Sequence, residues 1–240
     1  LWVRHLDGGS DDSFDLSIDG QPFASVPDSV TAETWFWRSF DVSGYADQRN
    51  DPAVEFPAGV SRMSAYLHHG QVSPFRIARE AASSGADGAA KFLDELLIWR
   101  ELAHNFCFHH ANPESLEGLP GWAGQTLDQH RRDPRRSIFT REQLARADTG
   151  DALWDAAQRS LLIHGELHNN LRMTWAKAIA HWTESPERAL AELIDLNHRH
   201  ALDGSDPNSY GGLLWALGLF DRPFTPARPV TGSLRARSTK

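Results

Sequence analysis

Cysteine is almost missing from this chain, and its scarcity restricts where the protein can work. Cys107 is the single cysteine among 240 residues, which excludes an internal disulfide and is typical of a reducing compartment. No run of 18 apolar residues occurs, so the sequence predicts no membrane span and no membrane partner. Residues 1–12 lack the basic head and apolar centre of a signal peptide. We therefore expect a cytoplasmic, intracellular protein, although a start at Leu1 instead of Met suggests a cut end.

Several common catalytic motifs are missing too. The sequence contains neither Gly-x-Gly-x-x-Gly nor Gly-x-x-x-x-Gly-Lys-Ser/Thr, so the standard dinucleotide and phosphate-loop folds have no support. It contains no Gly-x-Ser-x-Gly turn, which leaves hydrolase chemistry without a local signature. No alternating strand pattern of convincing length and no internal repeat of 20 to 50 residues is visible.

The charge of the chain gives only a weak indication of its partners. A net charge of −8 argues mildly against a protein whose whole surface binds nucleic acid. Arginines nevertheless concentrate in residues 131–136 and again in residues 222–237. Each concentration is either a solvated charged surface or a local basic patch that could contact phosphates.

Twelve histidines raise the question of a metal site. His164 and His168 stand four residues apart, a spacing at which two imidazoles on one helix could bind zinc. The metalloprotease pattern has Glu directly after the first His, whereas here Glu166 lies in the centre, and no cysteines support a structural site. We therefore expect no metal.

Apolar residues recur at intervals of three and four along most of the chain, which is the helical period. Residues 91–108 are apolar on more than one face, so we expect a buried helix there. Residues 1–30 show little periodicity and are interpreted as a linker or edge segment, residues 203–212 as a loop, and the end of the chain as a tail. The sequence predicts an all-α fold. The other expected helices cover residues 31–42, 74–79, 122–130, 140–147, 151–162, 166–182, 185–200 and 213–220.

Tryptophan is unusually frequent, with nine in the chain, and two of them define the most informative segment. Trp175 and Trp182 share one face of a predicted helix and lie roughly 10 Å apart along its axis at 1.5 Å per residue. Arg172 and Asn169 precede them on the same helix. Polar groups at one end of a buried helix can hold a polar cofactor ring, and indoles that lead away from it can carry an electron.

A second segment, residues 61–73, combines hydroxyl groups with a predicted helix start. Backbone N–H groups and hydroxyls at helix N-termini bind phosphate without needing lysines. The alternative is a plain capped helix, and the segment is informative only in combination with the rest of the chain.

Five segments of the chain resemble the FAD-binding half of photolyases, and most closely the class II cyclobutane pyrimidine dimer photolyases. They occur in the same order and with compatible spacing over residues 31–235. The segments are Ser64-Ala-Tyr-Leu-His-His-Gly-Gln-Val-Ser73, Phe92-Leu-Asp-Glu-Leu-Leu-Ile-Trp-Arg-Glu-Leu-Ala-His-Asn-Phe-Cys107, Trp154-Asp-Ala-Ala-Gln158, Arg172-Met-Thr-Trp-Ala-Lys177 and Leu202-Asp-Gly-Ser-Asp-Pro-Asn208.

The resemblance implies a helical FAD-binding catalytic domain over residues 31–240, with the flavin bound in a U shape. By this resemblance Arg172 and Asp203 pair beside the isoalloxazine ring, and Asn197 faces its N5 region. A fixed cation would stabilise the negative charge of a reduced flavin, although an ordinary buried ion pair is the alternative. The remaining cofactor contacts implied are Tyr45, Ser61, Met63 and Ser64 at the phosphates and ribityl chain, and Asn169 and Asn208 near the ring.

The same resemblance assigns residues to the substrate and to electron transfer. Trp99 and Trp215 would contact a flipped-out pyrimidine dimer, and Glu95 would hydrogen-bond it. Arg49 and Asp221 would form a polar pair at the rim. The indoles expected to carry electrons during photoreduction are Trp154, Trp175 and Trp182, each of which could instead be a core residue.

The chain departs from the family pattern at three motifs. The family's Ser-Pro-Tyr-Leu-His-Phe-Gly is Ser64-Ala-Tyr-Leu-His-His-Gly70 here, and its Arg-Met-Tyr-Trp is Arg172-Met-Thr-Trp175. The family's His-Gly-aromatic stands here as His168-Asn169-Asn170. These changes affect positions that bear on the speed of photoreduction and on the flavin state. We expect the N-terminal α/β antenna domain of photolyases to be absent, with the chain either a fragment or a form that lost the domain.

The function implied is light-dependent repair of cyclobutane pyrimidine dimers in UV-damaged DNA by an electron from photoexcited reduced FAD. Two alternatives stay open at this point. A cryptochrome-like blue-light sensor would use the same flavin and tryptophans without repair, and a degenerate domain would have an empty pocket. Trp99 and Trp215 favour repair, because a sensor has no need of indoles that stack on a dimer.

Overall fold

The computed structural model describes residues 61–86 and 88–237 with their side chains, and the backbone of strands within residues 2–7, 14–18, 21–26 and 34–39. The chain divides into two compact units, Leu1–Ile98 and Trp99–Lys240, and each is considered by itself. Among the helices of the described residues, none has the length and apolar character that crossing a bilayer requires. The assignment of residues 31–240 to a single domain stays a prediction.

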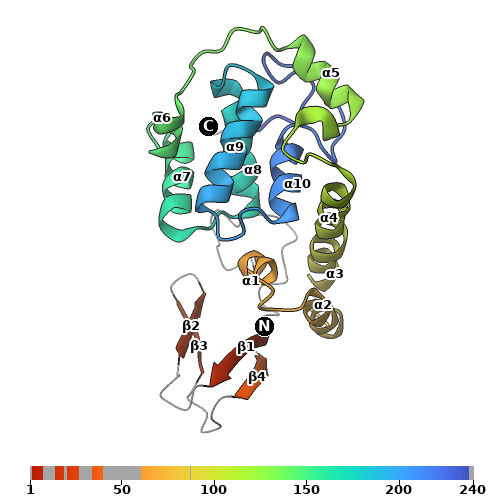
Figure 1. The fold of residues 1–240 in the computed structure, drawn as a ribbon, viewed down its shortest axis with the longest axis vertical. Coiled ribbons are helices and arrows are strands. Elements are labelled where there is room, and N and C mark those ends of the chain that lie inside the picture. Colours follow the sequence, from red (N-terminus) through yellow and green to blue (C-terminus); the bar gives the residue numbers. More distant parts are fainter. Residues whose placement is uncertain are drawn as a thin grey trace. The chain divides into compact units, whose positions relative to one another are not determined.

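The first unit begins with two antiparallel strand pairs (Figure 1). Strand β1 (Trp2–Asp7) pairs with β4 (Thr34–Ser39), and β2 (Phe14–Ile18) pairs with β3 (Gln21–Val26). The prediction of a helix over residues 31–42 is therefore wrong, because residues 34–39 form β4. The run Thr-Trp-Phe-Trp in β4 consists of residues that favour strands, and a short apolar run does not separate strand from helix by period.

Helices follow the strands in the first unit. They are α1 (Ser64–His68), α2 (Pro74–Ser83) and α3 (Ala89–Leu93), the last continuing into a π-helical segment, η3 (Asp94–Trp99), of which only Trp99 belongs to the second unit. The predicted start of α2 is confirmed: Pro74 occupies the first turn, where its missing N–H costs nothing. A small apolar core of Met63, Val72, Ile77 and Leu96 holds these helices together.

The second unit is helical, which confirms the predicted fold class for this part of the chain. Helices α7, α8, α9 and α10 lie side by side around its core (Figure 1). The elements are α4 (Arg100–His109), the 3-10 helix η4 (Leu116–Gly118), α5 (Gly121–Gln129), α6 (Arg141–Ala145), α7 (Ala152–His164), α8 (Asn169–Trp182), α9 (Pro186–His200) and α10 (Pro207–Ala216).

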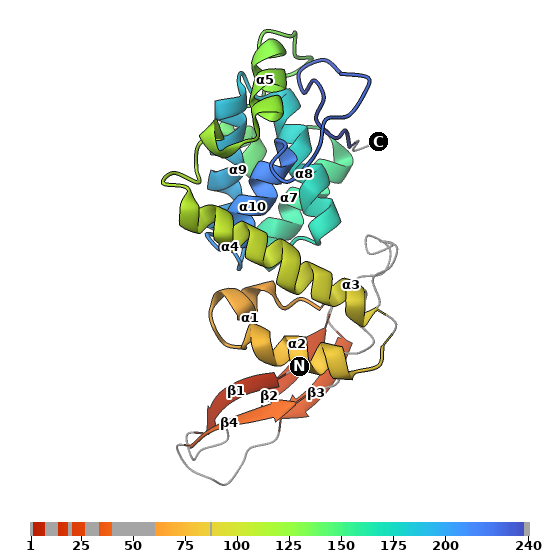
Figure 2. The same cartoon turned by 90° about the vertical axis from the view of Figure 1, so that its right-hand side faces the viewer.

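Two expected element boundaries are wrong for physical reasons. The expected loop 203–212 ends at Asp206, because its side chain caps α10 and Pro207 fits the first helical turn. Gly211 then lies inside a helix, where its missing side chain lets α10 approach α4 (Figure 2): a Cβ there would stand 2.7 Å from the Ala103 Cβ. Helix α8 begins three residues later than expected, because His168 serves as its N-cap.

The expected buried helix over residues 91–108 is also corrected. The segment is helical, but η3 interrupts its α-helical hydrogen bonding between α3 and α4. It is not buried as a whole, since Ile98 and Phe108 are 51% and 83% exposed. Apolar residues on several faces had suggested burial, and the structure leaves some of these faces open to solvent.

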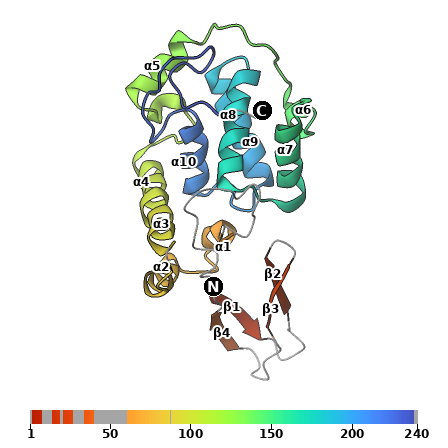
Figure 3. The same ribbon diagram turned by 180° about the vertical axis from the view of Figure 1, so that it is seen from behind.

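The expected C-terminal tail packs onto the second unit near α5 (Figure 3). The Ser233 N–H donates to Thr126 Oγ1 at 3.0 Å, and the Val230 N–H donates to Asp133 Oδ2 at 2.9 Å. Gly232 has φ +55°, and a Cβ on it would stand 2.0 Å from Thr126 Oγ1. Only glycine fits this position, so the segment is a fixed part of the fold.

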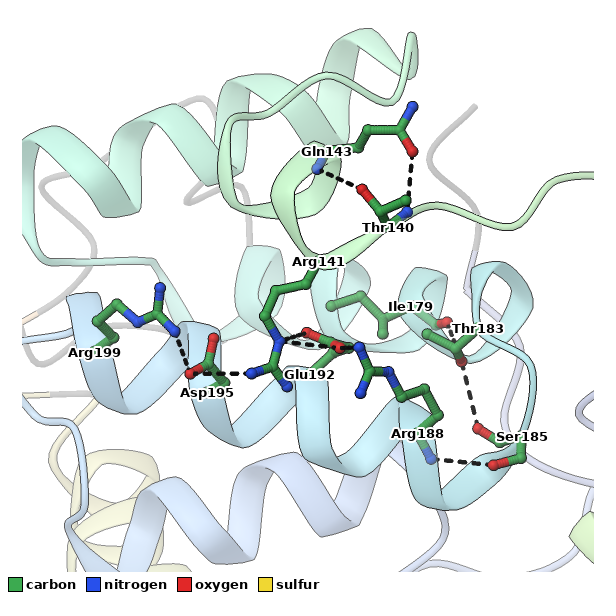
Figure 4. Close-up of polar contacts among 10 residues, drawn as sticks. All are labelled: Thr140, Arg141, Gln143, Ile179, Thr183, Ser185, Arg188, Glu192, Asp195 and Arg199. Carbon is green, nitrogen blue, oxygen red and sulfur yellow. Dashed lines mark hydrogen bonds and ion pairs between the residues drawn. The ribbon is translucent and has the colours of Figure 1, made fainter.

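A buried carboxylate ties α6 to α9 (Figure 4). Glu192 on α9 is 1% exposed and accepts from Nε of Arg141 at 3.0 and 3.3 Å and from Arg188 at 2.5 Å. Asp195, one turn later, lies 4.0 Å from Arg141 and pairs with Arg199. Two guanidinium groups compensate the burial of Glu192, so this cluster is part of the scaffold.

Candidate cofactor site and indole relay

Arg172 and Asp203, which the sequence predicts to pair, lie together in the second unit. Nη1 and Nη2 of Arg172 on α8 donate to the two carboxylate oxygens of Asp203 at 3.1 and 3.0 Å. Asp203 belongs to the loop between α9 and α10. Gly204 fixes this loop, since a Cβ there would stand 2.8 Å from the carbonyl oxygen of His198. Both partners are about 15% exposed, so the pair is a rigid, bidentate cation–carboxylate contact.

A chain of hydrogen bonds extends from this pair to the interior. The Ser209 hydroxyl donates to the carbonyl oxygen of Asp203 at 2.7 Å, and Nδ2 of Asn197 donates to the Ser209 hydroxyl at 3.1 Å. Because Ser209 has used its single hydrogen on Asp203, the Asn197 amide must donate to it, which fixes the amide orientation. Asn208 is directed elsewhere: its Nδ2 donates to Asp206 at 2.7 Å.

Two polar atoms of this network have no hydrogen-bond partner among the described residues. They are Nε of Arg172 and Oδ1 of Asn197, and both are buried. Asn197 is fully buried, and buried polar atoms in native proteins nearly always have a partner. A ligand that presents both an acceptor and a donor would satisfy both atoms. The polar edge of a flavin ring has this chemistry, so the residues fit the predicted cofactor.

The three predicted relay tryptophans form one continuous series of ring contacts. The ring centroids of Trp154 and Trp175 are 6.0 Å apart with an interplanar angle of 6°. Trp154 also contacts Trp182 edge-on at 5.4 Å. Trp154 therefore lies between the two indoles of α8, which the sequence had placed on one face with a gap of about 10 Å. Trp154 and Trp175 are each 1% exposed, whereas Trp182 is half-buried.

The two inner indoles of the relay have fixed hydrogen-bond acceptors. Nε1 of Trp154 donates to the carbonyl oxygen of Trp175 at 2.9 Å, and Nε1 of Trp175 donates to Oε1 of Gln158 at 3.0 Å. No role for Gln158 is predicted from the sequence. The available signal was its position as the last residue of the Trp154 motif, one helical turn after the tryptophan.

The two indoles expected at the substrate also meet in the second unit. Trp99 and Trp215 stack with centroids 4.5 Å apart at 28°, and Phe220 contacts Trp215 edge-on at 6.3 Å. Both indoles are half-buried, so an aromatic surface is available for stacking. Glu95 belongs to the first unit, where it is exposed and pairs with Lys91.

The other predicted contacts divide between the units. Ser61, Met63 and Ser64 lie in the first unit, where Met63 is buried in the small core and Ser64 is the exposed first residue of α1. Asn169 is the exposed first residue of α8 in the second unit. Tyr45 and Arg49 lie outside the described residues.

Asp221, expected at the rim of the substrate site, is bound by a different arginine within the second unit. Its carboxylate accepts from Nε and Nη2 of Arg235, each at 3.0 Å, and from the Arg222 N–H at 3.0 Å. Burial alone would raise the pKa of Asp221, but the hydrogen bonds from Arg235 and Arg222 outweigh it and lower the pKa. Asp221 is therefore charged at neutral pH.

Lys177 is a buried cation for which the sequence predicts no role. It is 6% exposed, and its Nζ donates to the carbonyl oxygen of Ala216, the last residue of α10, at 3.1 Å. Burial lowers the pKa of Lys177 to about 8; Asp221 opposes this shift, and Arg235 and Arg237 add to it. The contact joins α8 to the end of α10, directly beside Trp215.

The histidine spacing considered for zinc has no helical basis in the structure. His164 is the last residue of α7 and His168 the N-cap of α8, with Gly165 between them at φ +69°. No group of three or more His, Cys, Asp or Glu side chains within the described residues is arranged to hold a metal.

Comparison with known proteins gives specific matches by sequence. A protein named deoxyribodipyrimidine photo-lyase from Oryza sativa subsp. japonica is 42% identical over 198 residues, which cover 81% of this chain and 38% of that protein. Proteins of the same name from Arabidopsis thaliana and Methanothermobacter thermautotrophicus are each 40% identical, over 81% and 78% of this chain and 39% and 41% of their own lengths. The chain thus spans about two fifths of these curated relatives. No family model matches it.

Proposed function

Since this chain belongs to the deoxyribodipyrimidine photolyase family over about four fifths of its length, we propose that it takes part in light-dependent DNA repair. The substrate proposed is a cyclobutane pyrimidine dimer in UV-damaged DNA, and the cofactor is FAD. A reduced flavin, when bound, supplies an electron on excitation by blue light. Assignment to class II stays a prediction based on the sequence motifs.

The observation that carries the proposal is the polar network beside the indole relay. Arg172 and Trp175 lie one turn apart on α8, so a single helix carries a cation of the proposed ring site and an indole of the relay. The unpartnered atoms of Arg172 and Asn197 give a flavin ring two hydrogen-bonding positions. Arg172 would hold negative charge on the ring, and Asp203 would hold the Arg172 guanidinium in place.

The other residues receive roles that follow their surroundings. Trp99 and Trp215 would offer ring faces to a flipped-out dimer, for which unstacking from a damaged duplex is least costly. Trp154, Trp175 and Trp182 would carry electrons between solvent and the cofactor site, since they lead from buried to half-buried positions. The assignments proposed from the family alone are Tyr45, Arg49, Ser61, Met63, Ser64, Glu95, Asn169, Asn208 and Asp221.

The first experiment tests cofactor binding. The purified chain is mixed with FAD, freed of unbound pigment and examined by absorbance. We expect a yellow protein with near-stoichiometric flavin and, for Arg172→Met, at least a tenfold weaker affinity. Arg199→Met is the matched control, because Arg199 is an exposed, ion-paired arginine on α9. A well-folded wild-type chain that stays colourless would overturn the proposal.

The second experiment tests repair. A DNA oligonucleotide with one thymine dimer is illuminated with the FAD-loaded, chemically reduced chain, and dimer loss is measured. We expect light-dependent loss that weakens as salt rises, because phosphate contacts are screened. Trp99→Ala should reduce affinity for damaged DNA more than for intact DNA. Flavin binding and photoreduction without any dimer loss would instead support a blue-light sensor.

A further inference from the structure

Gln158 occupies an unusual place beside the relay. It is fully buried on α7, one turn after Trp154, and its Oε1 accepts from Nε1 of Trp175 at 3.0 Å. Its Nε2 is directed to the carbonyl oxygen of Ala145 at 3.4 Å. The indole N–H can only donate, so the amide oxygen must be the atom that faces Trp175.

We propose that Gln158 is a positioning residue of the indole relay: it holds Trp175 parallel to Trp154 and gives the Trp175 N–H an acceptor that cannot remove its proton. This inference rests on the proposed function, because it assumes that Trp175 gives up an electron.

The positioning half of the proposal follows from how the two rings are anchored. Trp154 binds the backbone of Trp175 through its N–H, and Trp175 binds the side chain of Gln158 on the helix of Trp154. Each indole is thus fixed by a hydrogen bond to the opposite helix. Two such bonds allow little rotation of either ring and account for the interplanar angle of 6°.

The second part of the proposal concerns the indole N–H proton of Trp175. A bound, photoexcited oxidised flavin would supply the electron acceptor, and the Trp175 ring would give up one electron. The N–H proton of the resulting radical cation stays in place, because an amide oxygen is a hydrogen-bond acceptor but a very weak base. One electron from Trp154 then reduces the Trp175 radical cation. The Trp154 N–H also faces an amide oxygen, the backbone carbonyl oxygen of Trp175. At each inner position an electron moves and no proton moves.

The outer position differs from the two inner ones. Trp182 donates an electron to Trp154, and its indole N–H makes no hydrogen bond to another described residue. Trp182 is half-buried, so water is the base within reach. The radical cation there loses its N–H proton to solvent, which leaves a neutral radical and prevents charge return. The arrangement therefore delays proton loss until the charge has reached the outer indole.

The hydrogen bond from Trp175 to Gln158 is tested without any flavin. In protein labelled with ¹⁵N at tryptophan, the nine indole N–H signals are followed by NMR, and Trp175 is assigned from its loss in Trp175→Phe. We expect the Trp154 and Trp175 signals to be the slowest of the nine to exchange in D₂O. Gln158→Met should shift the Trp175 signal and speed its exchange at least tenfold. Gln129→Met, an exposed glutamine on α5, is the control.

Flash photolysis of the FAD-loaded chain tests whether the Trp175 N–H proton stays in place after electron loss. Gln158→Glu keeps the size of the side chain but places an ionisable carboxyl against the Trp175 N–H. As pH rises and this carboxyl ionises, we expect a neutral radical trapped at Trp175 and at least a fivefold lower yield of the Trp182 radical. Wild type should show no such pH dependence. This separates an effect on the proton from an effect on packing.

Two results would overturn the inference while leaving the proposed function intact. One is an unchanged Trp175 signal in Gln158→Met, and the other is a Gln158→Glu variant with wild-type radical yields at every pH. If wild type itself gives no photoreduction after binding FAD, both the relay and the role of Gln158 are refuted. The two kinds of failure are therefore distinguishable.

Discussion

Lys177 provides the sharpest test of the structure because its environment predicts a pH dependence of stability in a definite direction. Its pKa falls from 10.5 to about 8 on folding, mainly through burial. Between these two values the unfolded chain binds more protons than the folded chain, so the free energy of unfolding rises with pH. This lowering of the Lys177 pKa corresponds to about 3 kcal/mol in total, because each pKa unit is worth about 1.4 kcal/mol.

Most of this gain in the free energy of unfolding falls in a pH range that is convenient for measurement. From about pH 7.5 to about pH 9.5 the wild-type chain should gain about 2 kcal/mol in its free energy of unfolding from Lys177 alone. Lys177→Met, which removes the titrating group, should lose this gain. Burial raises the pKa of Cys107, and burial together with Glu114 raises that of Tyr210 to about 12. Both lower stability at high pH, but they do so equally in the two proteins and cancel in the difference.

The assay is urea unfolding followed by far-ultraviolet circular dichroism at several pH values. Lys91→Met is the matched control, because Lys91 is an exposed, ion-paired lysine on α3. It should keep the wild-type pH profile. If the profiles of wild type and Lys177→Met run parallel within about 0.5 kcal/mol, Lys177 is not a buried cation in solution, and its contact with α10 is wrong.

Three further predictions follow from single contacts. Trp182→Phe should lower the yield of photoreduction at least tenfold, measured by flash photolysis, and leave repair by chemically reduced protein unchanged. Asp203→Asn should cost about 3 kcal/mol in urea unfolding, because it leaves the largely buried charge of Arg172 without its counter-ion; a loss below about 1 kcal/mol would contradict this. Gly212→Ala should stabilise α10 by about 0.5 kcal/mol, since its Cβ meets nothing, whereas Gly211→Ala should destabilise it by more than about 1 kcal/mol. Equal effects of the two alanines would contradict the packing described.

The helices that the sequence predicts best are those whose ends are fixed by neighbouring residues. Thr140 and Gln143 form the expected capping box, and Ser185 caps α9 with Pro186 in its first turn. These signals act within four residues, so they are visible without the fold. The wrong boundaries depend on distant partners. Strand β4 pairs with β1 more than 25 residues earlier, and Gly211 is tolerated in α10 because Ala103 lies against it.

The candidate site also combines features that the sequence indicates with features that depend on distant residues. Family motifs identified Arg172, Asp203 and the three relay indoles, but spacing alone did not reveal how they are arranged. Trp154 comes from α7 and enters between two residues of α8, which no pattern within one helix can indicate. Gln158 and Lys177 were missed because their partners are 17 and 39 residues away. A buried polar side chain is recognised as such only when the group it satisfies is known.

Helix α8 explains why these features occur together. Arg172 faces the loop of Asp203, Trp175 faces α7, Lys177 faces the end of α10, and Trp182 meets Trp154 further along. These four contacts point in different directions, so α8 has no single polar face. At 1.5 Å per residue, the helix also fixes the spacing of the proposed ring site and the relay more firmly than loops could. Changes that bend α8 should therefore affect flavin affinity and photoreduction together, whereas changes to its individual partners should affect them separately.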